Sequence, residues 1–330
     1  MSRTTIKDIA HVLGINPSTV SRALKDHPDI GLKLKEKIRT IADELGYSPN
    51  QYAVGLRNGK SFTIALVIPE ISMYFFPSLI KSIEEVVHKM DYHLMVLHSN
   101  DELVREMENA KICAAVGVDG MLVSLTRETT DLKHFDRLID NGVPIVYFDK
   151  TSMEGSTYNV VIFGETAAYD AVGYFFSKNK KPKKVCGIFG DKRLSITRDR
   201  LLGFERACED NKIKPANKQT GFASNPEDAA DILRKMYAGK EKPDALFVMS
   251  DELLSGIAPV IKELGIKVPQ DLDIIVLSDG FFPKFLPFHV PFIHTSGYEL
   301  GLSAARILFD LIDKNKVDPG LHFIKTPLIS

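Results

Sequence analysis

Residues 4–25, TTIKDIAHVLGINPSTVSRALK, predict two short helices around a tight turn, which fixes the kind of domain that begins the chain. Thr5 is placed to cap the first helix, and Asp8 three residues later completes the pattern of a capping box. Gly14 permits a sharp turn. Asn16-Pro17 is typical of a helix start, because Asn caps well and Pro suits the first helical position. We therefore expect a helix-turn-helix unit.

The second of these helices is expected to expose small polar side chains and one arginine. Its outward residues are Ser18, Thr19, Ser21 and Arg22. Arg22 can donate two parallel hydrogen bonds to a guanine edge, and the hydroxyls suit phosphates or bases. Such a helix fits the major groove of DNA. An ordinary surface helix hairpin is the competing interpretation of the two helices alone.

Two further helices are predicted before residue 60. One fits residues 32–45 and ends at Gly46. The other is a helix of about two turns within residues 48–59, with Pro49 near its start and Asn58-Gly59 at its end. An isolated helix this short is marginal in water. We expect it to fold when DNA and a partner subunit hold it.

The order and spacing of these motifs are specific. The matching segments are Thr5–Ala10, Thr19–Leu24, Leu45–Asn50, Ala53 and Leu56. On them, residues 4–59 resemble the DNA-binding headpiece and hinge of the lac repressor (LacI/GalR) family of bacterial transcription regulators. The resemblance implies that Leu56 is a wedge that two subunits insert into the minor groove. The DNA-binding residues expected from the pattern and the resemblance together are Thr5, Asn16, Pro17, Ser18, Thr19, Ser21, Arg22, Asn50, Tyr52, Ala53 and Leu56.

The hinge departs from the family at two positions. Val54 and Gly55 stand where Arg and Ser are usual. Glycine within a helix costs about 1 kcal/mol relative to alanine, and the missing arginine removes a possible phosphate or groove contact. We expect a softer hinge and a weaker grip on the operator.

Charge is divided unevenly along the 330 residues. Residues 1–60 carry ten Lys/Arg against six Asp/Glu, a balance of +4, and the remainder carries 32 against 37, a balance of −5. The positive field therefore lies where DNA would bind. The chain has no long apolar run and no signal-peptide core, so a cytoplasmic, nucleoid-associated protein is expected. The three cysteines have no metal or redox spacing, and we expect reduced core thiols and no cofactor or metal.

From residue 61 the pattern becomes an alternation of apolar runs and amphipathic segments. Buried strands are predicted at 62–69, 92–99, 120–125 and 143–149, and a second series at 159–163, 184–190, 244–250 and 272–278. Such alternation predicts two α/β lobes with parallel sheets. Ligands of these folds bind at the carboxyl edge of the strands, so two facing lobes make a hinged clamp for a small molecule.

This region resembles the effector domain of the same family, which is similar to periplasmic sugar-binding proteins. The markers are residues 118–120, 144–149, 200–204, 243–251, 265–269 and 300–301. The resemblance implies a homodimer on a near-palindromic operator. The domains expected are a helix-turn-helix domain at 1–47, a hinge helix and linker at 48–60, and an effector-binding and dimerisation domain at 61–330. Its N-lobe is expected at about 61–158 and 292–320, and its C-lobe at about 159–291 and 321–330.

Polar and aromatic residues at the strand ends are the expected effector contacts. They are Phe75, Phe76, Asn100, Asp101, Ser124, Asp149, Lys150, Phe163, Arg198, Arg200, Ser250, Asp251 and Asp279. Carboxylates would accept hydrogen bonds from sugar hydroxyls, and an arginine would bind hydroxyls or a carboxylate at two points. Asp251 and Asp101 as helix caps, and Arg200 in a structural ion pair, are the competing interpretations.

Several positions depart from the family in the cleft. Phe163 stands where Asp is common, Thr295-Ser296 where Gln-Pro is usual, and Met73-Tyr74 where Asn-Pro is frequent. Segment 281–292 adds five phenylalanines. These changes suggest a cleft less suited to hydroxyls, so the effector is expected to be apolar, aromatic or acidic, or to have been lost.

An enzyme is not expected. No nucleophile elbow of the G-x-S-x-G type is present, and no glycine-rich phosphate loop follows the first strand, at residues 68–71. A periplasmic binding protein would fit residues 61–330 but not the headpiece. The function predicted is a sequence-specific DNA-binding regulator, a repressor, switched by a small molecule through a shift between two states. The alternative is a regulator whose cleft is vestigial and which a partner protein controls.

Overall fold

The chain folds into two units, which divide at the boundary between Ser61 and Phe62. The computed structural model describes residues 4–47, 60–69, 71, 75–152, 156–178 and 181–330. Each unit has its own apolar core, as the alternation of patterns along the sequence predicts. None of the described helices has both the length and the apolar character needed to cross a bilayer.

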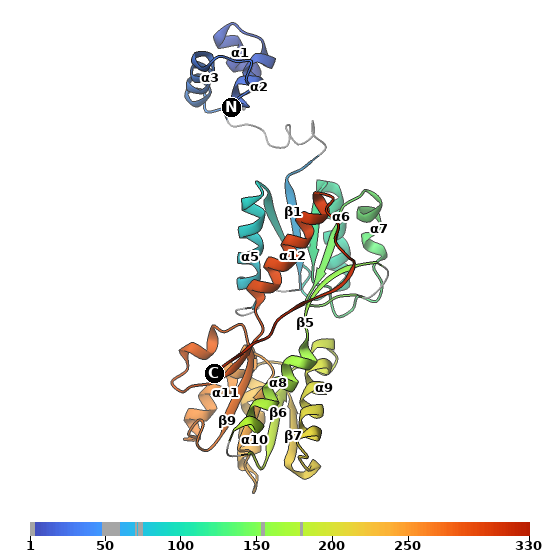
Figure 1. Ribbon diagram of the computed structural model, residues 1–330, viewed down its shortest axis with the longest axis vertical. Helices are drawn as coiled ribbons and strands as arrows, with labels where there is room; N and C mark the ends of the chain where they lie inside the picture. The colour runs from blue at the N-terminus through green and yellow to red at the C-terminus, as the bar shows by residue number, and fades with distance from the viewer. Residues whose placement is uncertain (1–3, 48–59, 70, 72–74, 153–155, 179–180) are drawn as a thin grey trace. The chain divides into compact units, whose positions relative to one another are not determined.

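The first unit contains three helices, α1 (Ile6–Leu13), α2 (Pro17–Leu24) and α3 (Leu32–Glu44), drawn in blue in Figure 1. Its small core is built from Ile9, Ala10, Val20, Ala23, Ile38 and Ala42. Gly14 adopts the left-handed conformation (φ 61°) that ends α1, which confirms the predicted turn. The predicted third helix is confirmed with its end one residue earlier. The predicted hinge helix at 48–59 lies outside the described residues.

The N-lobe of the second unit is built on a six-stranded parallel sheet in the order β11-β5-β4-β3-β1-β2. Its strands are β1 (Thr63–Ile68), β2 (His93–His98), β3 (Gly120–Val123), β4 (Ile145–Phe148), β5 (Tyr158–Ile162) and β11 (Gly320–Ile324). Its helices are α5 (Phe75–Lys89), α6 (Leu103–Val116), α7 (Asp136–Asp140) and α12 (Gly297–Ile312), with a 3-10 turn at Lys133–Phe135. Helices α5 and α12 cover one face of the sheet, and α6 and α7 cover the other.

The C-lobe is built on a second six-stranded sheet in the order β12-β10-β9-β8-β6-β7, parallel except for β12. Its strands are β6 (Val185–Phe189), β7 (Lys218–Phe222), β8 (Ala245–Val248), β9 (Asp273–Ser278), β10 (Phe292–His294) and β12 (Leu328–Ile329). Its helices are α8 (Gly164–Ser177), α9 (Ser195–Asp210), α10 (Pro226–Ala238) and α11 (Asp251–Glu263), with 3-10 turns at Pro215–Asn217 and Phe282–Phe285. Two parallel-sheet lobes confirm the predicted fold class.

The chain passes between the lobes three times, later than the sequence predicts at each passage (Figure 1). The run at 159–163 was expected to open the C-lobe, but β5 pairs with β4 and β11 in the N-lobe sheet. Residues 292–294 were expected in the N-lobe and instead form β10 beside β9. Segment 321–330 was expected in the C-lobe, yet β11 pairs with β5. These assignments were wrong because each crossing strand completes the sheet that it leaves, which periodicity alone cannot reveal.

The three cysteines are confirmed as core thiols. Cys113, Cys186 and Cys208 are free and buried. Burial raises the pKa of each thiol, to about 12 for Cys113 and Cys208 and about 11 for Cys186. Each is therefore a small apolar packing residue with almost no thiolate at neutral pH.

Close contact between α12 and α5 depends on glycine. A Cβ atom placed on Gly301 would lie 2.4 Å from the Ser82 hydroxyl oxygen and 2.7 Å from the Leu79 carbonyl oxygen. Since the carbonyl belongs to the α5 backbone, the helices would have to separate to accept it. Contacts between α12 and α5 help to cover the N-lobe sheet, where Leu300, Leu308 and Leu79 are fully buried.

We predict that Gly301→Ala lowers the free energy of unfolding by about 1 to 3 kcal/mol, the usual cost of overpacking. Gly173→Ala in α8 is the control, because its Cβ would meet no atom within 4 Å. The control should be neutral or more stable by up to about 1 kcal/mol through helix propensity. Urea denaturation of the full chain measures both, and equal stability of the two variants would contradict the packing argument.

Candidate functional site

The exposed face of α2 is the candidate nucleic-acid surface. Ser18 and Arg22 are exposed, while Thr19 and Ser21 are half-buried. No hydrogen bond or ion pair joins the Arg22 side chain to another described residue, so its donors remain available. Val20 and Ala23 on the opposite side are buried, which holds the helix against α1 and α3.

Three predicted DNA contacts also lie at helix starts. The Asn16 side chain accepts hydrogen bonds from the backbone N–H (2.9 Å) and the hydroxyl (2.8 Å) of Ser18, and Pro17 is the first residue of α2. Thr5 precedes α1 and is exposed, and its backbone N–H donates to Asp8 at 2.7 Å. Asn50, Tyr52, Ala53 and Leu56 lie outside the described residues.

A cavity of about 220 Å³ lies at the carboxyl ends of the strands, between residues of both lobes. We call it the front cavity. Its lining residues are Pro69, Phe75, Phe76, Asp149, Lys150, Leu194, Ile196, Arg200, Ser250, Asp251, Glu252, Leu277, Asp279 and Thr295. Eight of these were predicted from the sequence as effector contacts. The strand-end rule therefore brings together residues up to 204 positions apart, from Phe75 to Asp279.

Arg200 is the buried cation of the front cavity. Its side chain extends from α9, the residue is 8% exposed, and one terminal nitrogen donates to the Met249 carbonyl at 2.9 Å. The Nε atom is buried and has no hydrogen-bond partner among the described residues. Burial lowers the pKa of Arg200 to about 10, although the negative charges of Asp149 and Asp199 oppose the shift.

Asp149 faces Arg200 from the N-lobe. It follows β4 with a left-handed backbone (φ 58°), which is uncommon for a residue with a side chain and turns the carboxylate at the strand end. Ser124 donates to it only weakly, at 3.5 Å. Burial raises the pKa of Asp149, opposed by the positive charges of Lys150 and Arg200. No ion pair joins Asp149 to Arg200 in the described structure, so a bound group can lie between them.

Asp251 is the first residue of α11 and is 8% exposed. Its Oδ2 atom accepts from the Ser278 hydroxyl (2.9 Å) and from the Asp279 N–H (3.2 Å). Its Oδ1 atom is buried and, among the described residues, has no hydrogen-bond partner. Burial raises the pKa of Asp251 to about 6, and the charge of Asp279 adds to the shift. The helix cap is Ser250, whose hydroxyl accepts from the Leu253 N–H at 3.4 Å.

Asp279 connects the two lobes. It follows β9 in the C-lobe, and its carboxylate accepts from the N–H of Gly297, the first residue of α12, at 2.7 Å. Burial raises its pKa, while the Gly297 N–H and the Ser78 side chain of α5 favour the charged form. A lobe-to-lobe contact at the cavity wall is suited to respond when the lobes change their angle.

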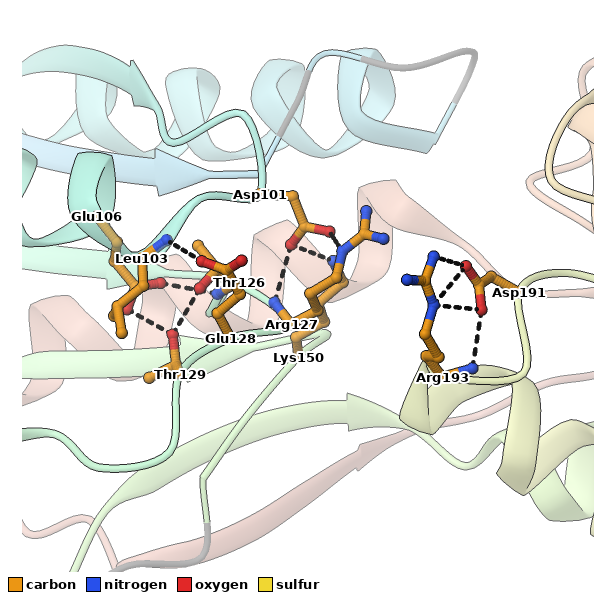
Figure 2. A network of polar contacts seen from close by, with 10 residues as sticks. All are labelled: Asp101, Leu103, Glu106, Thr126, Arg127, Glu128, Thr129, Lys150, Asp191 and Arg193. Carbon is orange, nitrogen blue, oxygen red and sulfur yellow. Dashed lines mark hydrogen bonds and ion pairs between the residues drawn. The ribbon is translucent and has the colours of Figure 1, made fainter.

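Asp101 and Lys150 form part of a polar network beside the cavity (Figure 2). The Lys150 ammonium donates to Asp101 at 3.0 Å, and Arg127 pairs with the other oxygen of the same carboxylate. These cations keep the pKa of Asp101 below its ordinary value despite burial, and the Arg127 backbone N–H is the largest favourable contribution. In the C-lobe, Arg193 pairs with Asp191 and lowers the pKa of that carboxyl to about 2.

Besides Asp101, four predicted contacts do not line the front cavity. Asn100 is exposed and its Oδ1 atom accepts from the His98 ring nitrogen Nδ1 at 3.0 Å, and Arg198 is exposed. Ser124 is fully buried behind Asp149. Phe163 is 46% exposed and stacks edge-on against Phe323 at 4.9 Å between ring centres.

Phe163 and Phe323 line a second cavity of about 360 Å³. It adjoins the front cavity and shares Phe75, Asp149, Ile196 and Arg200 with it. The aromatic replacement at 163 therefore borders the ligand region without entering the front cavity.

Sequence reasoning missed several lining residues. Leu194 and Ile196 lie at the start of α9, the helix that follows β6 along the chain, so the strand-end rule could have identified them. Thr295 was recognised as a departure from the family in the cleft but not as an effector contact, and it follows β10, a strand that was not recognised. Met249 does not line the cavity, but its carbonyl accepts from Arg200 and its sulfur accepts from the Gly190 N–H at 3.2 Å, and no sequence signal indicates this role.

Comparisons with known proteins agree with this arrangement. Residues 5–50 match the profile of bacterial regulatory proteins of the lacI family, and residues 176–330 match a periplasmic binding protein-like domain. The chain is 25% identical over 319 residues to catabolite control protein A of Priestia megaterium, covering 96% of this chain and 95% of the relative. It is 29% identical over 336 residues to the transcriptional regulator RegA of Clostridium acetobutylicum, covering 97% and 96%.

The fold is also that of a solved regulator. A lac repressor dimer bound to operator and the anti-inducer ONPF superposes with a TM-score of 0.85 at 19% identity, covering 100% of this chain and 98% of that chain. A helix-turn-helix headpiece joined to a two-lobed effector domain defines a DNA-binding transcriptional regulator. The chain combines a helix-turn-helix domain of the LacI family with a periplasmic binding protein-like domain, as its LacI-type relatives do.

We predict that Asp251→Asn changes the pH dependence of stability. Because the carboxyl has a raised pKa in the folded protein, folding takes up a proton between about pH 4 and pH 6, and stability falls as the pH rises through this window. The variant lacks this titration, so its stability relative to the native chain should rise by about 1 kcal/mol between pH 5 and pH 7. Asp313→Asn, at an exposed position, is the control in urea denaturation. A difference that does not vary with pH would contradict the raised pKa.

Proposed function

We propose that this chain is a repressor that binds a near-palindromic operator of the bacterial nucleoid as a homodimer, and that a small molecule in the front cavity controls it. The headpiece of each subunit reads one half-site with the exposed face of α2. Leu56 of the hinge enters the minor groove at the centre of the operator. The relatives and the unpartnered Arg22 side chain support this assignment.

One observation carries the effector part of the proposal. Arg200 Nε and Asp251 Oδ1 are buried at the front cavity and lack hydrogen-bond partners among the described residues. A buried polar atom without a partner costs about 1 to 3 kcal/mol. A ligand that supplies these partners stabilises the arrangement of lobes that surrounds it, and so shifts the population between two states. The domain boundaries that we propose are 1–47, 48–60 and 61–330.

A vestigial cleft controlled by a partner protein was the alternative. It is not favoured, because the LacI-type relatives carry an effector-binding domain. Unpaired polar groups in a cavity with no ligand would also be a standing cost to stability.

We predict that Arg22→Ala relaxes the preference at one base position of each half-site, at a cost of about 1 to 3 kcal/mol. The operator is obtained by selecting bound sequences from a random DNA library with the native chain. Repeating the selection with the variant shows whether one position loses its preference. Arg137→Ala, an exposed arginine of α7, is the control and should leave the operator unchanged.

Two outcomes would contradict the base-reading role. Equal weakening on every DNA sequence would show that Arg22 serves a phosphate. A native chain that selects no preferred sequence would contradict the proposed operator binding itself.

We predict that Arg200→Met removes the response to effector. A small-molecule extract of cells that carry the gene, added to the native chain on its selected operator, should change the DNA affinity by about tenfold, a usual allosteric coupling. Methionine keeps the apolar stem of the side chain and removes the donors. The variant should bind operator and ignore the extract, with Arg137→Ala again as the control. An undiminished response in the variant would contradict the role of Arg200.

A further inference from the structure

We propose that the ligand of the front cavity is a cation, a small molecule whose protonated amine is directed at Asp251 and whose neutral hydroxyl-type groups lie between Asp149 and Arg200. The inference rests on the proposed function, because it names the chemistry of the ligand that this cavity holds. The ligands to be compared fall into three chemical classes, namely amines, neutral polyols or phenols, and acids.

The charges that line the front cavity are unbalanced. Three buried or half-buried carboxylates, those of Asp149, Asp251 and Asp279, stand against the two cations Lys150 and Arg200. Lys150 is already paired with Asp101 at 3.0 Å. Arg200 faces Asp149, so these two offset each other. The remaining field at the Asp251 end of the cavity is negative, and it attracts a positive group.

Asp251 is the centre of this field. Asp251 is 8% exposed, and the Oδ2 atom of its carboxylate accepts both of its hydrogen bonds. The Oδ1 atom has no donor within the described chain, and no described lysine or arginine forms an ion pair with this carboxylate. A buried carboxylate without a cation is costly. An ammonium group has three donors and no acceptor, so it satisfies this oxygen and the charge together.

Asp279 strengthens the field without needing the ligand as its own partner. Its backbone N–H donates to Asp251, while its carboxylate accepts from the Gly297 N–H. Burial raises the pKa of Asp279, and the Gly297 N–H, the Ser78 side chain, His294 and Lys284 oppose that shift. An ionised Asp279 beside Asp251 makes the site more selective for a cation than one carboxylate alone.

The other end of the cavity suits neutral polar groups. Arg200 offers a donor at Nε, and Asp149 offers acceptors on the opposite lobe. A hydroxyl group both accepts and donates, so one hydroxyl can satisfy both sides. Phe75, Phe76 and Ile196 supply apolar walls for the body of the molecule. An acid bound at Arg200 would lie beside Asp149, which opposes the acidic effector that the sequence left open.

Binding of two matched series of probes to the full chain tests the proposal. One series is glucosamine, glucose and glucuronate, and the other is tyramine, tyrosol and 4-hydroxyphenylacetate. Within each series the body is kept and the charge changes from positive through neutral to negative. Dissociation constants come from calorimetry or from the ligand dependence of the melting temperature. In at least one series the amine should bind about tenfold more tightly than the neutral compound, the worth of one charge-assisted hydrogen bond. The acid should bind most weakly.

The Asp251→Asn variant shows whether the Asp251 carboxylate causes the preference for the amine. Asparagine keeps the shape and an oxygen for Ser278 and Asp279 but removes the charge, so the preference for the amine should fall to within about twofold. Asp313→Asn at an exposed position removes a carboxylate of the same kind and should keep the tenfold preference. The melting temperature of each variant without probe shows that it is folded.

Three results would overturn the proposal: a neutral or acidic probe that binds most tightly, no preference for the amine in either series, or a preference that survives in Asp251→Asn. Each leaves the proposed function standing if the cell extract still changes operator binding through Arg200. If the native chain does not respond to the extract, the proposed control by a small molecule fails instead.

Discussion

Parallel pairing of the strands is the constraint on which the effector domain depends. Because β4, β8 and β9 run in one direction within their sheets, their carboxyl ends carry Asp149, Asp251 and Asp279 to the edges that border one cavity. Apolar strand interiors cannot hold charged groups, so these side chains collect where the strands stop. Burial of apolar strands therefore specifies the scaffold, and the polar residues at the carboxyl ends of those strands form the site.

The polar groups at that edge are held with an incomplete set of partners. Arg200 has the Met249 carbonyl on one nitrogen and no partner on another, and Asp251 has two donors on one oxygen and no partner on the other. By contrast, Asp101 is saturated by Lys150 and Arg127. Saturated groups fix loops in place, whereas unsaturated ones favour whatever ligand completes them. This difference separates a structural acid, Asp101, from Asp251, which we propose faces the ligand.

Control of DNA binding requires that the bound ligand changes the contact between the lobes as well as the cavity itself. Asp279 is bonded across the lobes to Gly297 at the start of α12. Helix α12 in turn packs tightly on α5 through Gly301, so a shift at its first turn is carried by a rigid pair of helices. A bistable packed pair converts a small displacement into a discrete change. We propose that the hinge segment 48–60, for which Gly55 in the sequence predicts a soft helix, responds to it.

The sequence by itself determined the headpiece, the fold class and most of the polar cavity lining. Those features depend on local signals, such as Asn16-Pro17 at a helix start, apolar runs of strand length, and acids placed directly after them. The tertiary structure alone decided which sheet each crossing strand joins. Residues 159–163, 292–294 and 321–324 carry the same apolar pattern whichever sheet they complete, so only hydrogen-bond pairing assigns them. It also decided that Asp101 is paired while Asp251 is not, because a partner distant in sequence is brought near only by the fold.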